Sequence, residues 1–255
     1  MLGQKKVVCI IPARLASIRF PEKMLKMLEG KPILEWVWQA AKSVKVFDEC
    51  HFAIDDVKIA HLLDGFGASW FMTSKDAACG TDRLVELMDR EMLKADIWVN
   101  WQGDEPFIHE AMISDLLKTA EYDKDVDVWT LKKRITVMEQ IRSVNVAKVV
   151  TDSFGNAIYF SRSPIPYYRD EPLEACEFYK HVGLYAFSNR GLKSIKGIPP
   201  GPLERAEKLE MLRFLELGLK IRLHETLFEV RGIDTLEDLR CAEIYAQSLR
   251  ISVSH

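Results

Sequence analysis

Short apolar runs that alternate with longer helical patterns are the feature that most constrains the fold of this chain. A β-branched run over 6–11 precedes a helical pattern over 33–44, and a second run over 50–54 precedes another helical pattern over 57–66. Such alternation is typical of an α/β fold, in which a mostly parallel central sheet carries helices on both faces. The sequence therefore predicts this fold class for its first half.

The pattern changes from Val126 onward. Strand-like runs are now separated by turns such as 152–155, so antiparallel hairpins are favoured over helical crossovers. We therefore expect an antiparallel extension of the sheet. The same patterns predict further strands at 69–72, 96–101, 220–224 and 228–231 and further helices at 82–93, 111–122, 203–218 and 236–250.

Composition excludes several classes of protein. The 255 residues carry 35 basic and 38 acidic side chains, so no excess of positive charge is present to hold nucleic acid or an anionic membrane. The apolar run 7–13 is too short for a secretory signal, and no stretch approaches the ~18 apolar residues that a membrane span needs. The 5 cysteines show neither a CxxC pair nor zinc-ligand spacing, which predicts reduced thiols and a cytoplasmic protein.

Positive charges follow the first predicted strand. Arg14, Arg19 and Lys23 lie close together in the chain directly after it. In an open parallel sheet, ligands bind beyond the carboxyl ends of the strands, and cations there suit the oxygens of a polyphosphate. The segment is either a triphosphate-binding loop or a basic loop that faces solvent. It has no GxxxxGK[ST] pattern, which argues against a P-loop ATPase.

Two aspartates also lie beside predicted strands. Asp104 follows the strand at 96–101, and Asp234 precedes the last predicted helix. Mg²⁺ takes one or two carboxylates together with phosphate oxygens and water, so the two residues would complement each other. The competing interpretation is that both are helix caps, with Glu237 completing a capping box after Asp234.

Other candidate residues each allow two interpretations. Cys79–Arg83 opens a predicted helix, where free N–H groups and Arg83 suit an anion or a nucleobase edge, although Thr81 could be a simple cap. Arg162 follows a predicted strand and could bind a carboxylate or form a surface salt bridge. His181 alternates with apolar neighbours, which is more often a structural than a catalytic position.

The predicted helix 203–218 has an unusual arrangement of charge. At helical spacing, Glu204, Glu207 and Glu210 share one arc of its surface. These carboxylates could accept hydrogen bonds from sugar hydroxyls, or they could form a solvated acidic stripe.

Nine motifs follow one another along the chain: IPARLASIRFPEK, GKPIL, CGTDRL, NWQGDEP, NVAKVV, YFSRSPIPY, HVGLYAF, PLERAEKLEMLR and GIDTLEDL. With these segments in this order, the chain resembles the 3-deoxy-manno-octulosonate cytidylyltransferases, also called CMP-Kdo synthetases, over nearly its whole length. The resemblance implies a nucleotide-diphospho-sugar transferase fold in a single domain over 1–255, and a homodimer formed partly by an antiparallel segment at about 126–190. It implies Mg²⁺-dependent transfer of CMP from CTP to Kdo, an acidic eight-carbon sugar of lipopolysaccharide synthesis, with release of pyrophosphate.

The resemblance also implies roles for individual residues. The catalytic residues are expected to be Arg14, Lys23, Asp104 and Asp234, and both aspartates are expected to hold the Mg²⁺. The nucleotide-binding residues so implied are Arg14, Arg19, Lys23, Cys79, Gly80, Arg83 and Gln102. The sugar-binding residues so implied are Gln102, Arg162, His181, Tyr185, Glu207 and Glu210.

The chain departs from the family pattern at seven positions, and several of them flank the residues named above. The family usually has Tyr at Leu15, Ser or Thr at Ile18, Gly at Glu22, Pro at Met24, Thr at Ile54, Ser at Cys79 and Gln at Met211. They leave other activities open: the same reaction on 8-amino-3,8-dideoxy-manno-octulosonate, the reaction on a nine-carbon acid of the sialic type, or a catalytically silent homologue that binds nucleotide. The presumed metal and cation residues are all present, which favours an active enzyme.

Overall fold

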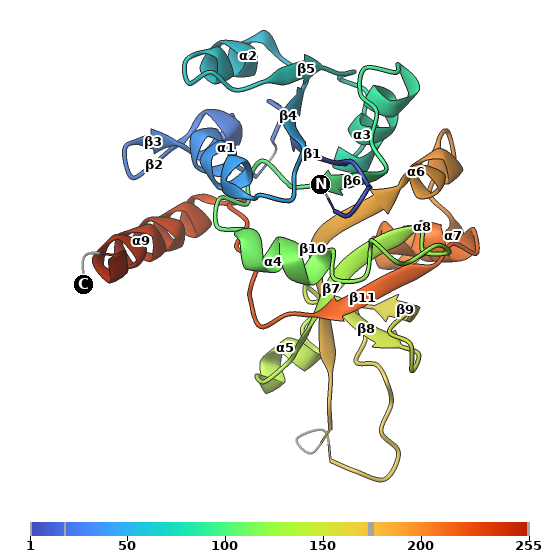
Figure 1. The fold of residues 1–255 in the computed structure, drawn as a ribbon. Coiled ribbons are helices and arrows are strands. Elements are labelled where there is room, and N and C mark those ends of the chain that lie inside the picture. Colours follow the sequence, from blue (N-terminus) through green and yellow to red (C-terminus); the bar gives the residue numbers. More distant parts are fainter. Residues whose placement is uncertain (1, 18, 173–175, 254–255) are drawn as a thin grey trace. The chain divides into compact units, whose positions relative to one another are not determined.

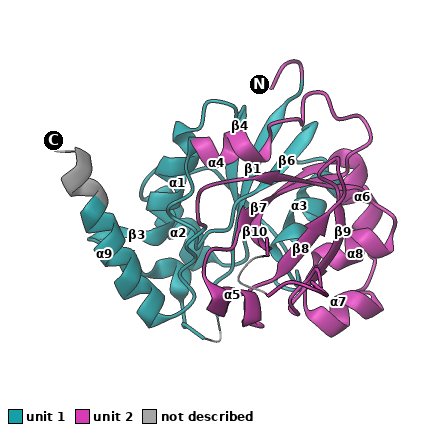
Figure 2. Ribbon diagram, turned by 90° about the horizontal axis from the view of Figure 1, so that it is seen from below, with its two compact units in different colours: residues 1, 5–110, 230–255 teal, residues 2–4, 111–229 magenta. Residues whose placement is uncertain are grey.

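The computed structural model describes residues 2–17, 19–172 and 176–253 (Figure 1). The chain divides into two compact units (Figure 2). Unit 1 contains residues 5–110 and 230–255, and unit 2 contains residues 2–4 and 111–229. That 1–255 act as one cytidylyltransferase domain stays a prediction.

Unit 1 is built on a parallel sheet, as the alternation of strands and helices predicted. The strand order is β6–β1–β4–β5, and Cys9 in β1 lies opposite Cys50 in β4 and Val99 in β6. Every residue of β1 is buried, because a central strand of a covered parallel sheet meets packing on both faces. The bounds are β1 (Val7–Ala13), β4 (Glu49–Ile54), β5 (Trp70–Met72) and β6 (Ile97–Asn100).

Helices α1 and α3 cover opposite faces of this sheet. The ring of Trp38 in α1 lies 5.8 Å from that of Phe52 in β4. Asn100 in β6 donates to Thr81 in α3 at 3.4 Å. Phe52 and Asn100 pair with successive residues of β1 and therefore point to opposite faces. The helices of unit 1 are η1 (Lys23–Leu25), α1 (Ile33–Ser43), α2 (Val57–Asp64), α3 (Gly80–Asp89) and α9 (Leu236–Val253), and β2 (Met27–Leu28) pairs with β3 (Lys31–Pro32).

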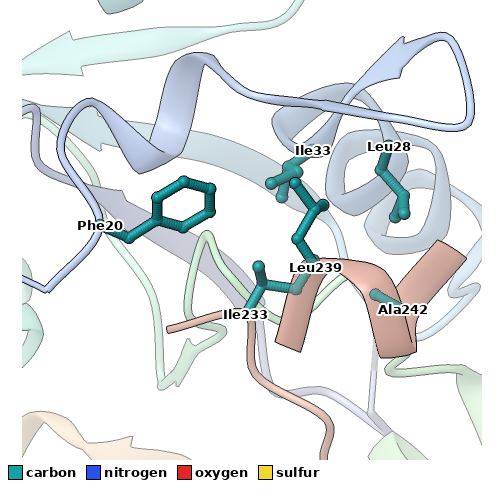
Figure 3. Packing of buried hydrophobic residues seen from close by; sticks show 6 residues of the cluster. All are labelled: Phe20, Leu28, Ile33, Ile233, Leu239 and Ala242. Carbon is teal, nitrogen blue, oxygen red and sulfur yellow. The ribbon is translucent and has the colours of Figure 1, made fainter. Parts of the chain in front are cut away.

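A buried apolar cluster joins the end of the chain to its beginning within unit 1 (Figure 3). Ile233 and Leu239 pack there with residues of the segment 20–33. This burial fixes where Asp234, between them in sequence, lies relative to the loop after β1. The members are Phe20, Leu28, Ile33, Ile233, Leu239 and Ala242.

Unit 2 confirms the expected antiparallel extension. β10 pairs antiparallel with β7 and β8, β8 pairs antiparallel with β9, and β11 joins β7 in parallel. In the predicted turn, Asp152 accepts from the backbone of Phe154 and Asn156, and Gly155 has a φ of +83°, a left-handed conformation that favours glycine. The strands are β7 (Val128–Arg134), β8 (Lys148–Thr151), β9 (Ala157–Ser161), β10 (Tyr179–Ser188) and β11 (Ile221–Glu225).

The predicted helix 203–218 is wrong as a single helix. Two short helices, α7 and α8, are separated at Lys208, whose φ is +54°. The break coincides with tertiary contacts, because the carboxylate of Glu207 accepts from Ser161 Oγ at 2.6 Å and from the backbone N–H of Arg162 at 2.9 Å. The helices of this part of the chain are α4 (Glu110–Leu116), α5 (Met138–Arg142), α6 (Asn189–Ile195), α7 (Pro202–Glu207) and α8 (Met211–Glu216).

The predicted strand at 228–231 is also wrong. The backbone N–H of Phe228 donates to Thr226 Oγ1, so a side chain takes the place of a strand partner.

Among the described helices, none is both long and apolar enough to cross a membrane.

Candidate active site

The ammonium group of Lys23 joins two aspartates that are far apart in sequence. Lys23 Nζ donates to Asp104 Oδ2 at 2.5 Å and to Asp234 Oδ1 at 2.8 Å. Arg19 Nη2 donates to the other oxygen of Asp234 at 2.8 Å. The side chain of Lys23 is 7% exposed, whereas Asp104 and Asp234 are 20% and 44% exposed. The two carboxylates therefore converge on one buried cation.

The close packing of Gly103 against the end of β1 positions its neighbour Asp104. A Cβ atom at Gly103 would lie 2.9 Å from the carbonyl oxygen of Pro12 and 3.2 Å from the side chain of Leu34. Only glycine lets this loop approach the end of β1 so closely. The carbonyl of Asp104 in turn accepts from the backbone N–H of Ile233 at 2.9 Å, which draws the segment before α9 alongside.

The capping alternative for the two aspartates is wrong. Asp104 lies in a turn, and the next helix, α4, begins several residues later. At the start of α9, Asp238 Oδ2 accepts from the backbone N–H groups of Asp234 and Thr235, and Thr235 Oγ1 accepts from Asp238 N. Thr235 and Asp238 therefore cap the helix, which leaves the carboxylate of Asp234 to Lys23 and Arg19.

The ion pairs of Lys23 with Asp104 and Asp234 shift the pKa values of Lys23 and Asp234. Burial by itself would lower the pKa of Lys23, but the charges and hydrogen bonds of Asp104 and Asp234 raise it above its ordinary value. Burial by itself would raise the pKa of Asp234, but the hydrogen bond and charge of Lys23, together with Arg19, lower it. Lys23 and Asp234 are therefore ionised at neutral pH.

The donor set fits a hard divalent cation that brings further ligands of its own. The residues described contain no group of three His, Cys, Asp or Glu side chains that could form a metal centre. Asp104 and Asp234 supply two carboxylates, which is what Mg²⁺ uses when phosphate oxygens and water complete its shell. Beside them, Glu105 Oε2 is buried without a hydrogen-bond partner in the described chain. Burial, and then the charge of Asp104, raise the pKa of Glu105 well above its ordinary value.

Two arginines of the basic loop are open to solvent. Arg14 follows β1 directly and is exposed, and Arg19 is 68% exposed. Ile18 lies outside the described residues. Both arginines are therefore accessible to an anion near Lys23.

Helix α3 begins against Gln102. It starts at Gly80, two residues earlier than predicted, with Cys79 at its N-cap position. A Cβ atom at Gly80 would lie 3.1 Å from Gln102 Nε2. Gln102 Nε2 donates to Asn100 Oδ1 at 3.0 Å, and Asn100 is 1% exposed. Sequence reasoning missed Asn100, although an amide at the end of an apolar strand is a signal that could have found it.

Arg83 is placed inside unit 1. It is 2% exposed, and its Nη2 donates to Asp55 Oδ2 at 2.8 Å. Its Nη1 donates to Thr73 Oγ1 at 2.5 Å. The expected contact of Arg83 with a nucleotide stays a prediction.

Glu22, one of the departures from the family pattern, has a left-handed backbone conformation. Its φ is +51°, and its carboxylate accepts from Lys58 Nζ at 2.7 Å. The hydrogen bond and then the charge of Lys58 lower the pKa of this carboxyl. A glycine would adopt this conformation without the steric cost that a Cβ atom brings.

We expect Glu22→Gly to be more stable than Glu22→Ala by about 1 kcal/mol in urea unfolding, because both lose the Lys58 contact but only alanine keeps the left-handed strain. Glu237, exposed in helix α9, is the control. There the order must reverse, since alanine favours helix over glycine by about 1 kcal/mol. Equal stabilities of the two Glu22 variants would contradict the strain.

In unit 2, Arg162 and Glu207 lie together. Arg162 Nε donates to the carbonyl of Glu207 at 2.6 Å, its Nη1 to the carbonyl of Val144 at 2.7 Å, and its Nη2 to that of Lys208 at 3.3 Å. The structure thus brings together two of the expected sugar-binding residues. It also shows that Arg162 holds the end of α7, a role that the sequence did not indicate.

The buried ammonium group of Lys148 binds the backbone carbonyl of Arg162. Its side chain is fully buried, and its Nζ donates to the carbonyls of Ser143 and Val146 at 2.8 and 2.7 Å and to that of Arg162. Burial, and then the charge of Arg162, lower the pKa of Lys148. A lysine within the apolar strand β8 was the signal for this residue, and sequence reasoning missed it.

His181 and Tyr185 form a second group in unit 2. Their ring centroids lie 5.4 Å apart, and the ring of Phe160 lies 5.0 Å from His181. Thr130 Oγ1 is 3.0 Å from His181 Nε2. Burial lowers the pKa of His181 to about 4, so its ring is neutral at pH 7.

This depressed pKa predicts a loss of stability in acid. The unfolded chain takes up a proton on His181 below about pH 6.5, whereas the folded chain does so only near pH 4. Between these values the unfolded state binds more protons, so the free energy of unfolding falls as pH falls, by up to about 3 kcal/mol from this group. Urea unfolding of the wild type and of His181→Asn from pH 7 to pH 4 measures the contribution.

The His181→Asn profile should be flatter. His61→Asn, at an exposed position on α2, is measured in parallel as the control for a histidine replacement outside the interior. Parallel profiles of wild type and His181→Asn would show that the ring is as easily protonated in the folded as in the unfolded chain.

The acidic arc expected on one helix does not exist. Glu204 binds Arg213, with Nε and Nη2 each donating to one of its oxygens at 2.7 Å. Glu207 binds Arg162 and Ser161, and Glu210 is the N-cap residue of α8. Met211, another departure from the family pattern, is 2% exposed.

Comparison with known proteins identifies the family. A family model described as cytidylyltransferase matches residues 8–221. The 3-deoxy-manno-octulosonate cytidylyltransferase of Thermodesulfovibrio yellowstonii is 42% identical over 246 residues, which cover 92% of this chain and 96% of that protein. The protein of the same name from Geobacter sulfurreducens is 45% identical over 242 residues, covering 91% and 96%.

Solved structures agree with this result. CMP:2-keto-3-deoxy-manno-octonic acid synthetase complexed with CTP superposes with a TM-score of 0.89 and 37% identity, covering 95% of this chain and 99% of that one. A 4-diphosphocytidyl-2C-methyl-D-erythritol synthase from Anaerococcus prevotii, with a TM-score of 0.57 and 16% identity over 96% of this chain and 98% of that one, shares the fold alone.

The chain belongs to the cytidylyltransferase family, a group of nucleotidyltransferases with a mixed α/β fold. Within this family it falls among the 3-deoxy-manno-octulosonate cytidylyltransferases, the CMP-Kdo synthetases. The fold class and the family resemblance predicted from the sequence are both confirmed.

Proposed function

We propose that this enzyme transfers CMP from CTP to 3-deoxy-manno-octulosonate, with release of pyrophosphate, and so supplies CMP-Kdo for lipopolysaccharide synthesis. The relatives named above support this substrate pair. The single observation that carries the proposal is the convergence of Asp104 and Asp234 on Lys23, directly beside the basic loop.

The cations act on the triphosphate. Arg14 and Arg19 are exposed on the loop that leads from β1 to Lys23 and can bind the triphosphate oxygens. Lys23 can neutralise charge on the phosphoryl group and on the departing pyrophosphate. The anomeric hydroxyl of the sugar attacks the α-phosphorus in line, so the new C–O–P linkage forms as the bond to pyrophosphate breaks. The proton of the hydroxyl passes to water or to a carboxylate.

The charge balance of the site supports a requirement for Mg²⁺. Lys23 and Arg19 are already matched by Asp104 and Asp234, which leaves Arg14 as the cation with no matching carboxylate among these residues. One arginine neutralises a triphosphate poorly. Asp104 and Asp234 would hold Mg²⁺, which when bound neutralises phosphoryl oxygens and orients the triphosphate.

The test is sugar-dependent release of pyrophosphate. Purified protein is mixed with CTP, Mg²⁺ and Kdo, and pyrophosphate is followed in parallel reactions without sugar. Release that depends on Kdo is expected. Release only with the 8-amino analogue or with a nine-carbon acid would change the substrate, and no release with any acidic sugar would favour a silent nucleotide-binding homologue.

We expect Arg162→Ala to raise KM for the sugar at least about tenfold while KM for CTP stays within about twofold. The change removes a cation for the sugar carboxylate and frees the α7 end that carries Glu207. Arg190→Ala is the control, because this arginine also lies in unit 2 but contacts Asp127. A selective loss of CTP affinity in Arg162→Ala would place Arg162 with the nucleotide instead.

We further propose that the enzyme is a cytoplasmic homodimer that pairs through about 126–190. Large apolar side chains are exposed in this segment: Phe154 is 77% exposed, Val144 64% and Ile158 61%. Exposed apolar groups of this size favour a protein interface. Residues 173–175 of the segment lie outside those described. Light scattering should give twice the 29.3 kDa chain mass, and a monomer would contradict the proposal.

A further inference from the structure

Asp55 is a buried carboxylate that the reaction proposed above does not use. It follows β4 directly and is 7% exposed. Its Oδ2 accepts from Arg83 Nη2 at 2.8 Å, and its Oδ1 accepts from the backbone N–H of Leu15 at 2.9 Å. Leu15 is the residue after Arg14. One carboxylate therefore connects a buried guanidinium to the backbone of the basic loop.

The other side of Arg83 holds the end of a third strand. Its Nη1 donates to Thr73 Oγ1 at 2.5 Å and to the carbonyl of Ser74 at 3.1 Å. Thr73 Oγ1 in turn donates to the carbonyl of Ile54 at 2.9 Å. The segments that follow β1, β4 and β5 are thus tied to one residue of α3. Both terminal nitrogens of Arg83 are engaged within the protein.

A cavity lies beside the Asp55–Leu15 contact. Its volume is about 450 Å³, within the range of small-molecule sites. The loop contributes Leu15, Ala16 and Ser17 to one wall, and Asp55 contributes to another. The position of the loop backbone therefore shapes the cavity and the direction in which Arg14 leaves β1.

We infer that Asp55 and Arg83 are positioning residues, which fix the basic loop and Arg14 for the triphosphate of CTP. The inference rests on the proposed function, because it takes CTP as the nucleotide. Arg83 thereby acts on the nucleotide through Asp55 and the backbone of Leu15. Loosening of this contact should weaken nucleotide binding and leave the sugar affinity as it is.

The main experiment exchanges the buried ion pair for an apolar pair. Such exchanges in protein interiors often preserve stability, so an Asp55→Leu/Arg83→Met variant can lose the loop contact without losing the fold. Asp55→Asn is the milder second variant, since its amide oxygen can still accept from Leu15, while its NH₂ group replaces the oxygen that accepts from Arg83. Thermal unfolding, calorimetric binding of CTP without sugar, and KM for CTP and for Kdo are measured on the full chain.

We expect the double variant to bind CTP at least about tenfold more weakly, with KM for Kdo within about twofold of wild type. Asp55→Asn should show a smaller loss in the same direction. The control replaces a largely buried ion pair of unit 2, as Glu204→Leu/Arg213→Met. That variant should keep the wild-type affinity for CTP.

Two results would overturn the positioning role. One is unchanged CTP affinity in folded Asp55 variants, and the other is an equal rise of both KM values, which would indicate general damage. Failure of the proposed function is a separate outcome. A wild-type protein that binds CTP but releases no pyrophosphate with any acidic sugar would refute the reaction, while the calorimetric comparison would still decide the role of Asp55.

Discussion

Replacement of Asp104 or Asp234 by alanine should lower kcat/KM by at least about a thousandfold in Mg²⁺, with the fold intact. Each change removes one of the two carboxylates proposed to hold the metal, which weakens the binding of Mg²⁺ and its hold on the triphosphate. Steady-state release of pyrophosphate measures the effect, and circular dichroism checks the fold.

Asp64→Ala is the control for these variants. This aspartate lies in α2 of the same unit and accepts only from the indole of Trp70 among the hydrogen bonds resolved for its side chain. It should keep activity within about twofold of wild type. Near-normal rates in Asp104→Ala or Asp234→Ala would show that the two-carboxylate metal site is wrong.

Lys23→Met should lower kcat/KM by about a hundredfold to a thousandfold and, in the same protein, tighten the binding of Mg²⁺ in the absence of nucleotide. The ammonium group lies between Asp104 and Asp234, where it competes with a metal for their oxygens. Its removal leaves two neighbouring carboxylates without their cation. Calorimetric titration with Mg²⁺ and the pyrophosphate assay test the two effects separately.

Lys58→Met provides the comparison, since this lysine is 60% exposed and contacts Glu22 at the surface. Neither its activity nor its Mg²⁺ affinity should differ appreciably from wild type. If Lys23→Met binds Mg²⁺ no more tightly than wild type, the lysine does not compete for the two aspartates, and the metal must bind elsewhere.

Local pattern was sufficient for most of the fold. The apolar run of β1 and its helical partner α1 lie within one or two residues of their predicted bounds, because a buried central strand and an amphipathic helix each have a strong local signature. The predicted helix 203–218 failed because Glu207 accepts hydrogen bonds from Ser161, at the end of the distant strand β9, and from Arg162, which follows it. No local pattern contains that contact.

For the candidate site, too, the sequence identified the residues, and only the tertiary structure showed which of them meet. The order of motifs was enough to name Lys23, Asp104 and Asp234. Locally, however, Asp104 was equally well explained as a helix cap, and Asp234 was better explained as one. Their convergence on one ammonium group depends on the close approach at Gly103 and on the packing of Ile233.

The sequence by itself determined the fold class, the family and the identity of the charged residues, because these depend on local periodicity and on motif order. Only the tertiary structure decided which charges meet. In the folded protein the carboxylate of Asp234 pairs with Lys23 and does not cap a helix, and Arg83 is buried against Asp55. Burial and ion pairing depend on residues tens to hundreds of positions apart, and the free energies that select them arise only when the chain has folded.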